Sequence, residues 1–407
     1  MKLSEELQWR GFVNQMTFDD ISKVDTPRKF YFGVDPSADS MQIGNLAAAM
    51  MVRLFMEYGH EAYLLVGGAT GMIGDPDGRK DEREIRNADT VAHNVECISA
   101  QYRRVFEGRD FHLVDNADWF RNINYIDFLY KVGKHMSMTQ LLDREFVQAR
   151  IGEGGSGISY AEFSYSLMQG YDFLHLFREY GVTLQVCGAD QWGNSTTGVS
   201  LIRKLEGSEA HVYSVPLVIN KATGRKFGKS EGGAIWLDEN KTSVYKFYQF
   251  WLNVDDDGVI DYMKMYTTLD RESIEALAEN HAVNPGARSA QKVLAREVTD
   301  IVHGVNRRES VERVTEVLFG GGDFRQLSDD DLDALAKEIP RVDVGVGVIE
   351  ALVVSGAVSS NGEAKRLLKS GAISLNGEKI TEDQAVNTTS LLKKGKNTFV
   401  LIMEGEE

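Results

Sequence analysis

The 407-residue chain has few cysteines, few prolines and no long apolar run. Its two cysteines, Cys97 and Cys187, are too few for a disulfide framework, and such sparse use of cysteine is typical of a reducing compartment. No apolar stretch approaches the ~20 residues that a membrane-spanning helix needs. The first residues, Met1 to Glu6, also lack the basic and apolar pattern of a signal peptide. We therefore expect a cytoplasmic protein that does not enter a membrane.

Positive charge is also scarce, because 45 Lys and Arg face 61 Asp and Glu, for a net charge of −16. This balance argues against a protein whose whole surface binds nucleic acid, although local basic clusters can still bind RNA. No His, Cys and Asp residues stand at the spacing of a zinc site, so we expect no metal held by the protein.

The segment from Lys29 to Gly59 predicts a strand, a polar turn and a helix. Phe30–Val34 is aromatic and β-branched, as in a buried strand, and Asp35-Pro36-Ser37 ends it with turn residues. Apolar residues and alanines then dominate from Gln42 to the glycine stop. The amino end of such a helix attracts phosphate, and Gly44 leaves room there for a flat adenine. The alternative is an ordinary first unit of an α/β domain.

A second predicted strand, Glu61–Val66, runs into the glycine-rich stretch 67–76. Glycine lets the backbone approach a ligand closely, although glycine-rich turns are common. Asp75 lies at the carboxyl end of that strand, where open α/β sheets bind ligands, and could pair with an ammonium group. As a single observation, an Asp before Pro is more often a turn residue.

Residues 159–171 predict a helix with polar side chains at positions that share one face. Tyr165, Gln169 and Asp172 stand at i, i+4 and i+7, which suits the wall of a polar pocket better than a plain core. The next strand, from Leu184, ends near Asp190, and an acidic residue in that position commonly holds ribose hydroxyls.

The loop 220–230 carries cations among glycines: Lys221, Arg225, Lys226 and Lys229. It is either a basic surface loop or a mobile clamp that stabilises phosphates as their charge develops.

Two signatures together resemble a known family. Tyr31-x-Gly33-x-Asp35-Pro36-Ser37 with Gln42-Ile43-Gly44-Asn45, and then Lys226-Phe227-Gly228-Lys229-Ser230, are similar to the signatures of bacterial tyrosyl-tRNA synthetases, which are class I aminoacyl-tRNA synthetases. The resemblance covers essentially the whole chain. In that family the first signature usually ends in His-Ile-Gly-His, so Gln42 and Asn45 depart from it.

The resemblance implies an α/β fold with a Rossmann-like nucleotide-binding catalytic domain, an α-helical domain and a small C-terminal α+β RNA-binding domain. We expect these at residues 1–240, 241–320 and 341–407, with a linker at 321–340. A dimer-forming insertion is expected at about 117–158, including one helix at 125–138, and a phosphate-clamp loop at 224–230.

The resemblance also implies tyrosine–tRNA ligation, with ATP as substrate accompanied by Mg²⁺, no permanently bound cofactor, tRNA(Tyr) as partner and a homodimer. The implied catalytic residues are Gln42, Asn45, Lys226, Lys229 and Ser230. Those for tyrosine are Tyr31, Asp75, Asn116, Tyr165, Gln169, Asp172 and Gln191. Those for ATP are Gly33, Asp35, Ser37, Gly44, Gly188, Asp190 and Lys229. Those for tRNA are Lys365, Arg366, Lys369, Lys393 and Lys394.

Two other functions stay open at this point. Tryptophan ligation uses a similar core, but indole has no hydroxyl for Tyr31 and Asp172 to bind. A paralogue with weakened or lost aminoacylation, acting as an RNA-binding scaffold or adenylating tyrosine without tRNA, is suggested by Gln42 and Asn45. Gln42 also stands three residues after Asp39, the spacing at which it could close a capping box on the helix instead of binding phosphate.

Overall fold

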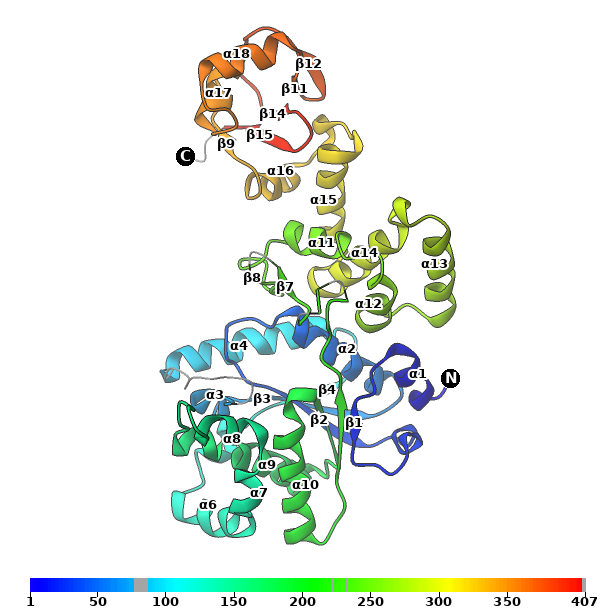
Figure 1. Ribbon diagram of the computed structural model, residues 1–407, viewed down its shortest axis with the longest axis vertical. Helices are drawn as coiled ribbons and strands as arrows, with labels where there is room; N and C mark the ends of the chain where they lie inside the picture. The colour runs from blue at the N-terminus through cyan, green and yellow to red at the C-terminus, as the bar shows by residue number, and fades with distance from the viewer. Residues whose placement is uncertain (77–86, 222, 225, 231–232, 405–407) are drawn as a thin grey trace. The chain divides into compact units, whose positions relative to one another are not determined.

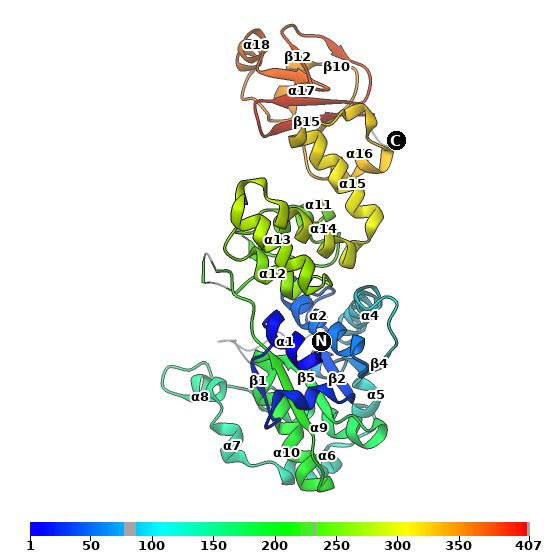
Figure 2. The ribbon, with the colours of Figure 1, turned by 90° about the vertical axis from the view of Figure 1, so that its right-hand side faces the viewer.

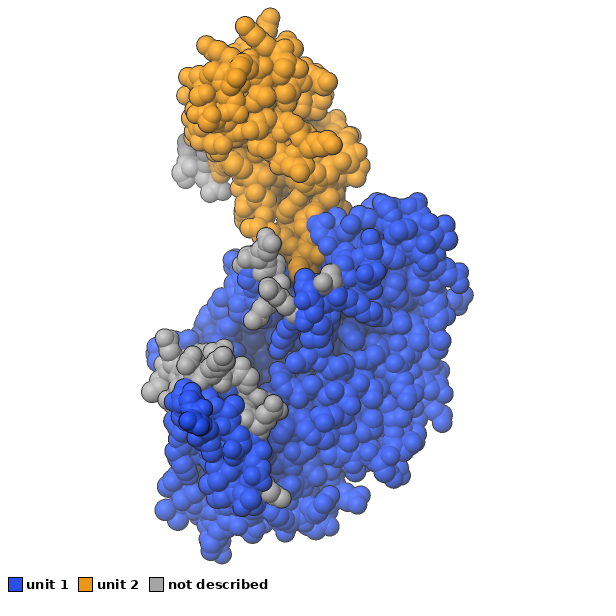
Figure 3. All heavy atoms as spheres, in the orientation of Figure 1, with its two compact units in different colours: residues 1–242, 251–302 blue, residues 243–250, 303–407 orange. Residues whose placement is uncertain are grey.

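The structure, a computed structural model, describes residues 1–76, 87–221, 223–224, 226–230 and 233–404. It describes only the backbone of Gln140, Glu145, Phe146, Lys229 and Ser230. Two compact units make up the chain (Figure 3). Unit 1 holds residues 1–242 and 251–302, and unit 2 holds residues 243–250 and 303–407.

A six-stranded sheet in the order β1-β6-β5-β2-β3-β4 is the centre of unit 1 (Figure 1). All neighbours pair in parallel except β1, which is antiparallel to β6. Because β3 and β4 lie on one side of β2 while β5 and β6 lie on the other, the order reverses between β2 and β5, where open α/β sheets bind ligands. The strands are β1 (Gln15–Met16), β2 (Lys29–Val34), β3 (Glu61–Val66), β4 (Phe111–Asp115), β5 (Leu184–Gly188) and β6 (His211–Val215).

Helices cover both faces of this sheet. Phe30 on β2 packs against Phe55 of α2 (Ile43–Glu57), with ring centroids 5.5 Å apart. Its neighbour Tyr31 points to the other face and packs against Phe173 of α9 (Tyr160–Tyr180) at 5.3 Å. Figures 1 and 2 show α2 and α4 on one side of the sheet and α9 and α10 on the other. Burial on both faces explains why the strands are continuously apolar instead of alternating.

The helix α9 has clear chemical ends. The Ser159 side chain accepts a hydrogen bond from the Glu162 backbone N–H at its start, and Gly181 ends it with a φ of +72°. The other helices of unit 1 are α1 (Leu3–Arg10), α3 (Thr70–Ile73), α4 (Ala88–Val105), α5 (Ala117–Phe120), α6 (Tyr125–Lys131), α7 (Met138–Leu142), α8 (Glu145–Ile151), α10 (Trp192–Glu206), α12 (Val259–Tyr266) and α13 (Arg271–Val283). Two more, α11 (Val244–Leu252) and α14 (Ser289–His303), extend across the unit boundaries.

The single helix expected at 125–138 is wrong. The structure has α6, a 3₁₀ turn at Gly133–His135 and then α7. Val132 leaves the helical conformation with φ −120° and ψ −58°, and its buried side chain anchors the break beside a glycine.

Unit 2 contains a five-stranded sheet in the order β12-β11-β14-β15-β9, with helices on both faces (Figure 1). On β15 (Thr398–Ile402), Phe399 and Leu401 join the core with α15 (Val305–Thr315) and α16 (Asp329–Ala336). The alternate residues Val400 and Ile402 join the core with α17 (Val348–Val354) and α18 (Asn361–Lys369). The remaining strands are β9 (Arg341–Val342), β10 (Val346–Gly347), β11 (Ile373–Leu375), β12 (Glu378–Ile380), β13 (Ala385–Val386) and β14 (Ser390–Lys394).

The hairpin between β11 and β12 is confirmed at Asn376-Gly377, where both residues have positive φ, +49° and +86°. The stretch 321–340, which we expected to be a linker, carries α16 and contributes Phe324 and Leu335 to the core of unit 2. The predicted domain boundaries stay predictions. In the part of the chain that the structure describes, no helix is long and apolar enough to cross a membrane.

Candidate active site

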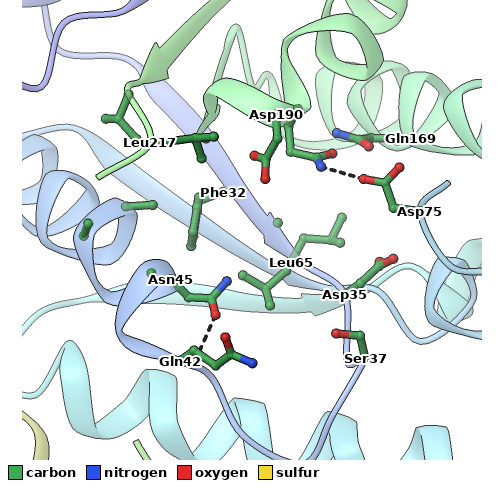
Figure 4. Close-up of a pocket in the computed structure, with 18 of the residues that line it drawn as sticks. Phe32, Asp35, Ser37, Gln42, Asn45, Leu65, Asp75, Gln169, Asp190 and Leu217 are labelled. Carbon is green, nitrogen blue, oxygen red and sulfur yellow. Dashed lines mark hydrogen bonds between the residues drawn. The ribbon is translucent and has the colours of Figure 1, made fainter. Parts of the chain in front are cut away.

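A cavity of about 370 Å³ opens at the carboxyl ends of β2, β3 and β5, where the strand order reverses (Figure 4). Its wall combines residues from the strands, the amino end of α2, the middle of α9 and the loop after β6. Most residues expected from the sequence line it: Tyr31, Gly33, Asp35, Ser37, Gln42, Gly44, Asn45, Asp75, Tyr165, Gln169, Asp172, Gly188, Asp190, Gln191 and Lys226.

Asp172 on α9 is 2% exposed and is held by two neutral donors. The Asn116 side-chain amide donates to its Oδ2 at 3.1 Å, and the Trp119 indole N–H donates to its Oδ1 at 2.9 Å. Burial raises the pKa of the Asp172 carboxyl well above its usual range, and these two hydrogen bonds oppose that shift without an ion pair. A further hydrogen-bond donor that enters the cavity would therefore stabilise the ionised carboxylate.

Two further polar atoms beside Asp172 are buried and have no hydrogen-bond partner among the described residues, the Tyr31 hydroxyl and Gln169 Oε1. Burial, and then the nearby charge of Asp172, raises the pKa of Tyr31 well above its usual range, so the phenol keeps its proton. Buried polar groups normally have partners, and an unpaired one in a cavity suits a polar ligand. A hydroxyl-bearing aromatic ring fits beside Tyr31 and Asp172, and an ammonium group fits beside Gln169.

Two other carboxylates in the cavity are linked to neighbouring side chains. Asp75 Oδ2 accepts from the Gln191 side-chain amide at 2.5 Å, as Figure 4 shows. Asp35 accepts from the Tyr165 hydroxyl at 2.8 Å and from Thr70 Oγ1 at 2.7 Å. These hydrogen bonds hold the side chains of Tyr165 and Gln191 in fixed positions on the cavity wall.

The helix α2 begins one residue after Gln42, which is its N-cap. The side-chain oxygen of Asn45 accepts the backbone N–H of Gln42 at 3.0 Å (Figure 4). The alternative in which Gln42 closes a capping box that starts at Asp39 is therefore wrong, and Asn45 closes a box that starts at Gln42. Asp39 instead forms an ion pair with Lys241 at 2.7 Å. At Gly44 a side chain would meet nothing within 4 Å, so the first turn is open on that side.

The glycine-bounded loop after β6 reaches this cavity through Lys226. Its ammonium group lies 3.8 Å from Asp190 Oδ2, and both side chains are about half exposed. Phe227 anchors the loop by stacking on Tyr262, with ring centroids 4.2 Å apart. Lys221 pairs with Asp261. Arg225 lies outside the described residues, and Lys229 and Ser230 form β7 (Lys229–Ser230), which pairs with β8 (Gly233–Ala234).

The sequence reasoning missed three residues that hydrogen-bond the carboxylates of the site. Thr70 donates to Asp35, Trp119 donates to Asp172, and the Asn194 amide lies 3.5 Å from Asp75. Asn116, expected near the substrate, is fully buried behind Asp172 and is not among the described residues that line the cavity. Asn116 and Trp119 stand three residues apart just after a predicted strand, and this spacing could have indicated that both side chains donate to one acceptor.

The five basic residues of unit 2 that were expected to bind tRNA fall into two groups. Lys365, Arg366 and Lys369 are exposed on α18. Lys393 and Lys394 lie on β14 and donate to backbone carbonyls, those of Leu318 and Ala357.

Comparison with known proteins agrees with this geometry. The family model "tRNA synthetases class I (W and Y)" matches residues 23–320, and "Tyrosine--tRNA ligase SYY-like C-terminal domain" matches residues 331–406. Tyrosine--tRNA ligase 2 of Bacillus cereus is 42% identical over 425 aligned residues, which cover 100% of both chains. The chain belongs to the class I tyrosyl-tRNA synthetases.

Two further relatives of this synthetase support the same family. Tyrosine--tRNA ligase of Latilactobacillus sakei is 42% identical and matches 99% of this chain and 97% of its own. A C-terminally truncated mitochondrial tyrosyl-tRNA synthetase of Aspergillus nidulans has a solved structure that matches with a TM-score of 0.70 at 28% identity, over 78% of this chain and 94% of that one. The resemblance inferred from the two signatures and the predicted fold class are confirmed.

Proposed function

We propose that this synthetase attaches L-tyrosine to tRNA(Tyr) in two steps. The tyrosine carboxylate attacks the α-phosphorus of ATP, the bond to the β-phosphate oxygen breaks, and pyrophosphate leaves. A ribose hydroxyl at the 3′ end of the tRNA then attacks the carbonyl carbon of the tyrosyl-adenylate, and AMP leaves. The nucleophile of the first step is already ionised, so the protein's contribution is positioning and charge stabilisation.

The buried pair of Tyr31 and Asp172 carries this proposal. A phenol hydroxyl can donate to the Asp172 carboxylate, whose own donors leave it without a cation, and can accept from the Tyr31 hydroxyl. Indole carries no hydroxyl that could accept from Tyr31, so it would leave the buried Tyr31 hydroxyl without a partner, which disfavours tryptophan. The amino group of the substrate fits near Asp75, Tyr165 and Gln169, all of which line the same cavity.

The opposite end of the cavity suits ATP. We place adenine and ribose against Gly33, Gly44, Gly188 and Asp190 and the phosphates near Ser37, where the amino end of α2 supplies a partial positive charge. Because Asn45 closes the capping box with its oxygen, its amide N–H₂ is free of that role and can donate to the nucleotide. Mg²⁺ would arrive with ATP, bound by phosphate oxygens and water more than by protein.

We further propose that Gln42, Lys226, Lys229 and Ser230 stabilise the leaving pyrophosphate. Gln42 lines the cavity at the start of α2, and the Asn45 backbone N–H has a backbone acceptor, the Gln42 carbonyl, at 2.9 Å. ATP binding would break the ion pair between Lys226 and Asp190. The Lys226 ammonium group would then bind phosphate, and the Asp190 carboxylate would accept from ribose hydroxyls.

A homodimer is proposed from an exposed apolar surface on the insertion and the first residue of α9. Large apolar side chains there lie mostly in solvent, which is typical of an interface between copies of a chain. They are Tyr125, Ile126, Tyr130, Met138 and Tyr160, with exposed fractions of 57–70%. Light scattering should give twice the chain mass, and Ile126→Asp should reduce it to the monomer.

For tRNA, we propose the exposed face of α18, with Lys365, Arg366 and Lys369, as a phosphate-binding surface. A cytoplasmic location stays a prediction from the sparse cysteines and the absent signal pattern.

Tyrosine-dependent exchange of labelled pyrophosphate into ATP tests the first step, and charging of tRNA(Tyr) tests the second. Both should occur with tyrosine, and neither with tryptophan. Exchange without charging would indicate a tyrosine-adenylating enzyme, and no exchange would overturn the proposal.

A further inference from the structure

The hydroxyl of Ser40, two residues before Gln42, joins three segments of unit 1. Ser40 is 5% exposed. Its Oγ accepts from the Gln101 side-chain amide at 2.8 Å and from the Asp238 backbone N–H at 3.1 Å, and it donates to the Met41 carbonyl at 2.9 Å. One buried hydroxyl therefore ties the turn before α2 to α4 and to the segment after the phosphate-clamp loop.

Gln101 on α4 makes the second half of this junction. While its amide N–H₂ donates to Ser40, its Oε1 accepts the backbone N–H of Met41 at 2.7 Å. Both ends of the side chain thus bind consecutive residues, which fixes the position of the chain immediately before Gln42. Asn94, also on α4, donates to the carbonyl of Pro36, which precedes Gln42 in the same turn region.

The chain that the junction fixes is paired with the far side of the phosphate-clamp loop. The Met41 carbonyl accepts from the Leu237 N–H at 2.9 Å, and the Ile43 N–H donates to the Ile235 carbonyl at 3.1 Å. The Ile235 N–H in turn donates to the carbonyl of Gly228, inside the loop, at 3.0 Å. Gly228 has a φ of +96°, and a side chain there would lie 2.7 Å from Ile43. Hydrogen bonds and short stretches of backbone therefore link the Ser40 hydroxyl with the amino end of α2 and with the phosphate-clamp loop.

We propose that Ser40 and Gln101 are positioning residues for tyrosine adenylation, which hold Gln42 and the phosphate-clamp loop in register on opposite sides of the pyrophosphate. This inference rests on the proposed function. Neither side chain needs to touch substrate. Their contribution is the alignment of two groups of donors, and a misplacement of about 1 Å in such an arrangement costs up to ~10²-fold in rate.

Tyrosine binding should be independent of this junction. The residues proposed for the phenol and the ammonium come from β2, the segment after α3, and α9, and their hydrogen bonds involve neither Ser40 nor Gln101. A loss of positioning should therefore appear in kcat for adenylation and leave tyrosine affinity intact.

Ser214 on β6 offers a matched control for Ser40→Ala. It is also fully buried, and its hydroxyl also makes three bonds: it accepts from the Asn14 amide and the Gln15 N–H, both at 3.1 Å, and donates to the Gln15 carbonyl at 3.0 Å. Ser214→Ala removes the same chemistry where β1 joins the edge of the sheet. Both variants should lose similar thermal stability, because each leaves two donors and one carbonyl without the hydroxyl.

We expect Ser40→Ala to lower kcat for pyrophosphate exchange about ten-fold, with the tyrosine dissociation constant within about two-fold of wild type. Ser214→Ala should keep the wild-type kcat. Gln101→Met should reproduce the loss in kcat, and Ser40→Ala with Gln101→Met should be no slower than either single variant, because both act through one junction. Gln101→Glu, which keeps an acceptor for Met41, should be intermediate.

Three results would overturn the inference: wild-type kcat in both single variants, equal losses in Ser40→Ala and Ser214→Ala, or tyrosine affinity that falls with kcat. Gln101→Met decides the matter alone if Ser40→Ala does not fold. Wild-type protein without any tyrosine-dependent exchange would count against the proposed function itself, whereas active wild type with unaffected variants would count against this junction only.

Discussion

Among the described residues, each unit contains an aspartate that is at most 2% exposed, and the two are held in opposite ways. Asp172 in unit 1 is 2% exposed and Asp331 in unit 2 is 0% exposed. Asp172 has an amide and an indole as partners, whereas Asp331 accepts two parallel bonds from the Arg313 guanidinium, at 2.8 and 2.9 Å. Burial raises the pKa of both carboxyls. For Asp331 the bonds from Arg313, Ser310 and Ser328 outweigh burial and lower the pKa to about 2.

The difference separates a carboxylate kept for a ligand from one that holds the fold. A bidentate arginine satisfies Asp331 within the protein, and the same carboxylate closes the capping box of α16 with Ser328. Asp172 lacks such a cation and lies on a cavity wall, so its stabilisation is incomplete until a donor arrives. Acids whose pKa is shifted by burial on a cavity wall are typical of functional sites.

The strongest test of the comparison is Asp172→Asn. We expect the fold to persist and the preference for tyrosine over phenylalanine in kcat/KM to collapse. Tyrosyl-tRNA synthetases are themselves the reference case for a hydroxyl-binding site that rejects the analogue by roughly 10⁴–10⁵, so that magnitude belongs to the family and is not calculated from this structure. Asp331→Asn is the matched control, and a preference that survives in Asp172→Asn would contradict the assignment.

Arg313→Met should produce the largest effect on stability. It leaves Asp331 buried without its cation, and breaking a buried pair costs about 3–5 kcal/mol. Because the Arg313 side chain is 48% exposed, we expect less, about 1–3 kcal/mol. Hydrogen exchange of the amides of β14 and β15 would measure it in the full chain. Pyrophosphate exchange should be unchanged, and equal protection in mutant and wild type would show that the pair stabilises nothing.

The two aspartates should also respond to pH with opposite signs. The pKa of Asp331 is lowered, so its contribution to stability is present above its usual pKa of 3.8 and is lost as pH falls towards about 2. The pKa of Asp172 is raised, so its contribution is fully present below 3.8 and is lost as pH rises above that value. Calorimetry between about pH 5 and pH 2 should show unit 2 losing up to about 2 kcal/mol, and Asp331→Asn should flatten that slope. A slope unchanged by the substitution would assign the acid sensitivity to other groups.

The same comparison extends to the lysines of unit 2 and predicts the smallest effect. Lys393 donates to Leu318 and lies 5.1 Å over the Phe399 ring, so it acts within the fold. We expect Lys393→Met to change the KM for tRNA little and stability by about 1 kcal/mol or less. Replacing Lys365, Arg366 and Lys369 by alanine should instead raise that KM and reduce the salt slope of binding by about 0.9 for each phosphate that the variant no longer neutralises. Equal effects on tRNA in both variants would contradict the distinction.

Much of the fold was predictable because local chemistry and burial agree. The β2 strand, the turn at Asp35-Pro36 and the part of α9 up to Tyr171 follow from the local sequence pattern, whereas the continuation of α9 to Tyr180 was not predicted. The site residues on α9 were predictable because their spacing places them on one helical face.

The missed features depend on pairings between distant segments. A preference for Asp at N-caps pointed to Asp39, but its ion pair with Lys241 and the bridge from Gln42 to Trp236 keep the chain extended to Gln42. No local rule contains Trp236. The inward role of Lys393 was hidden for the same reason, because its partner Leu318 is 75 residues away. The sequence showed a basic cluster without showing which of its members the fold uses.

The position of β15 within its sheet has a consequence for biosynthesis. This strand is made after every other element of unit 2, yet it lies between β14 and β9 and supplies residues to both cores. During translation, the apolar faces of α15 and α16 therefore stay exposed to solvent until Thr398–Ile402 leaves the ribosome. A messenger that ends shortly before Thr398 would yield a protein with a complete active-site unit and a C-terminal part whose apolar residues are exposed to proteases. Protein quality control would then degrade this truncated synthetase, so it would not accumulate as an active fragment.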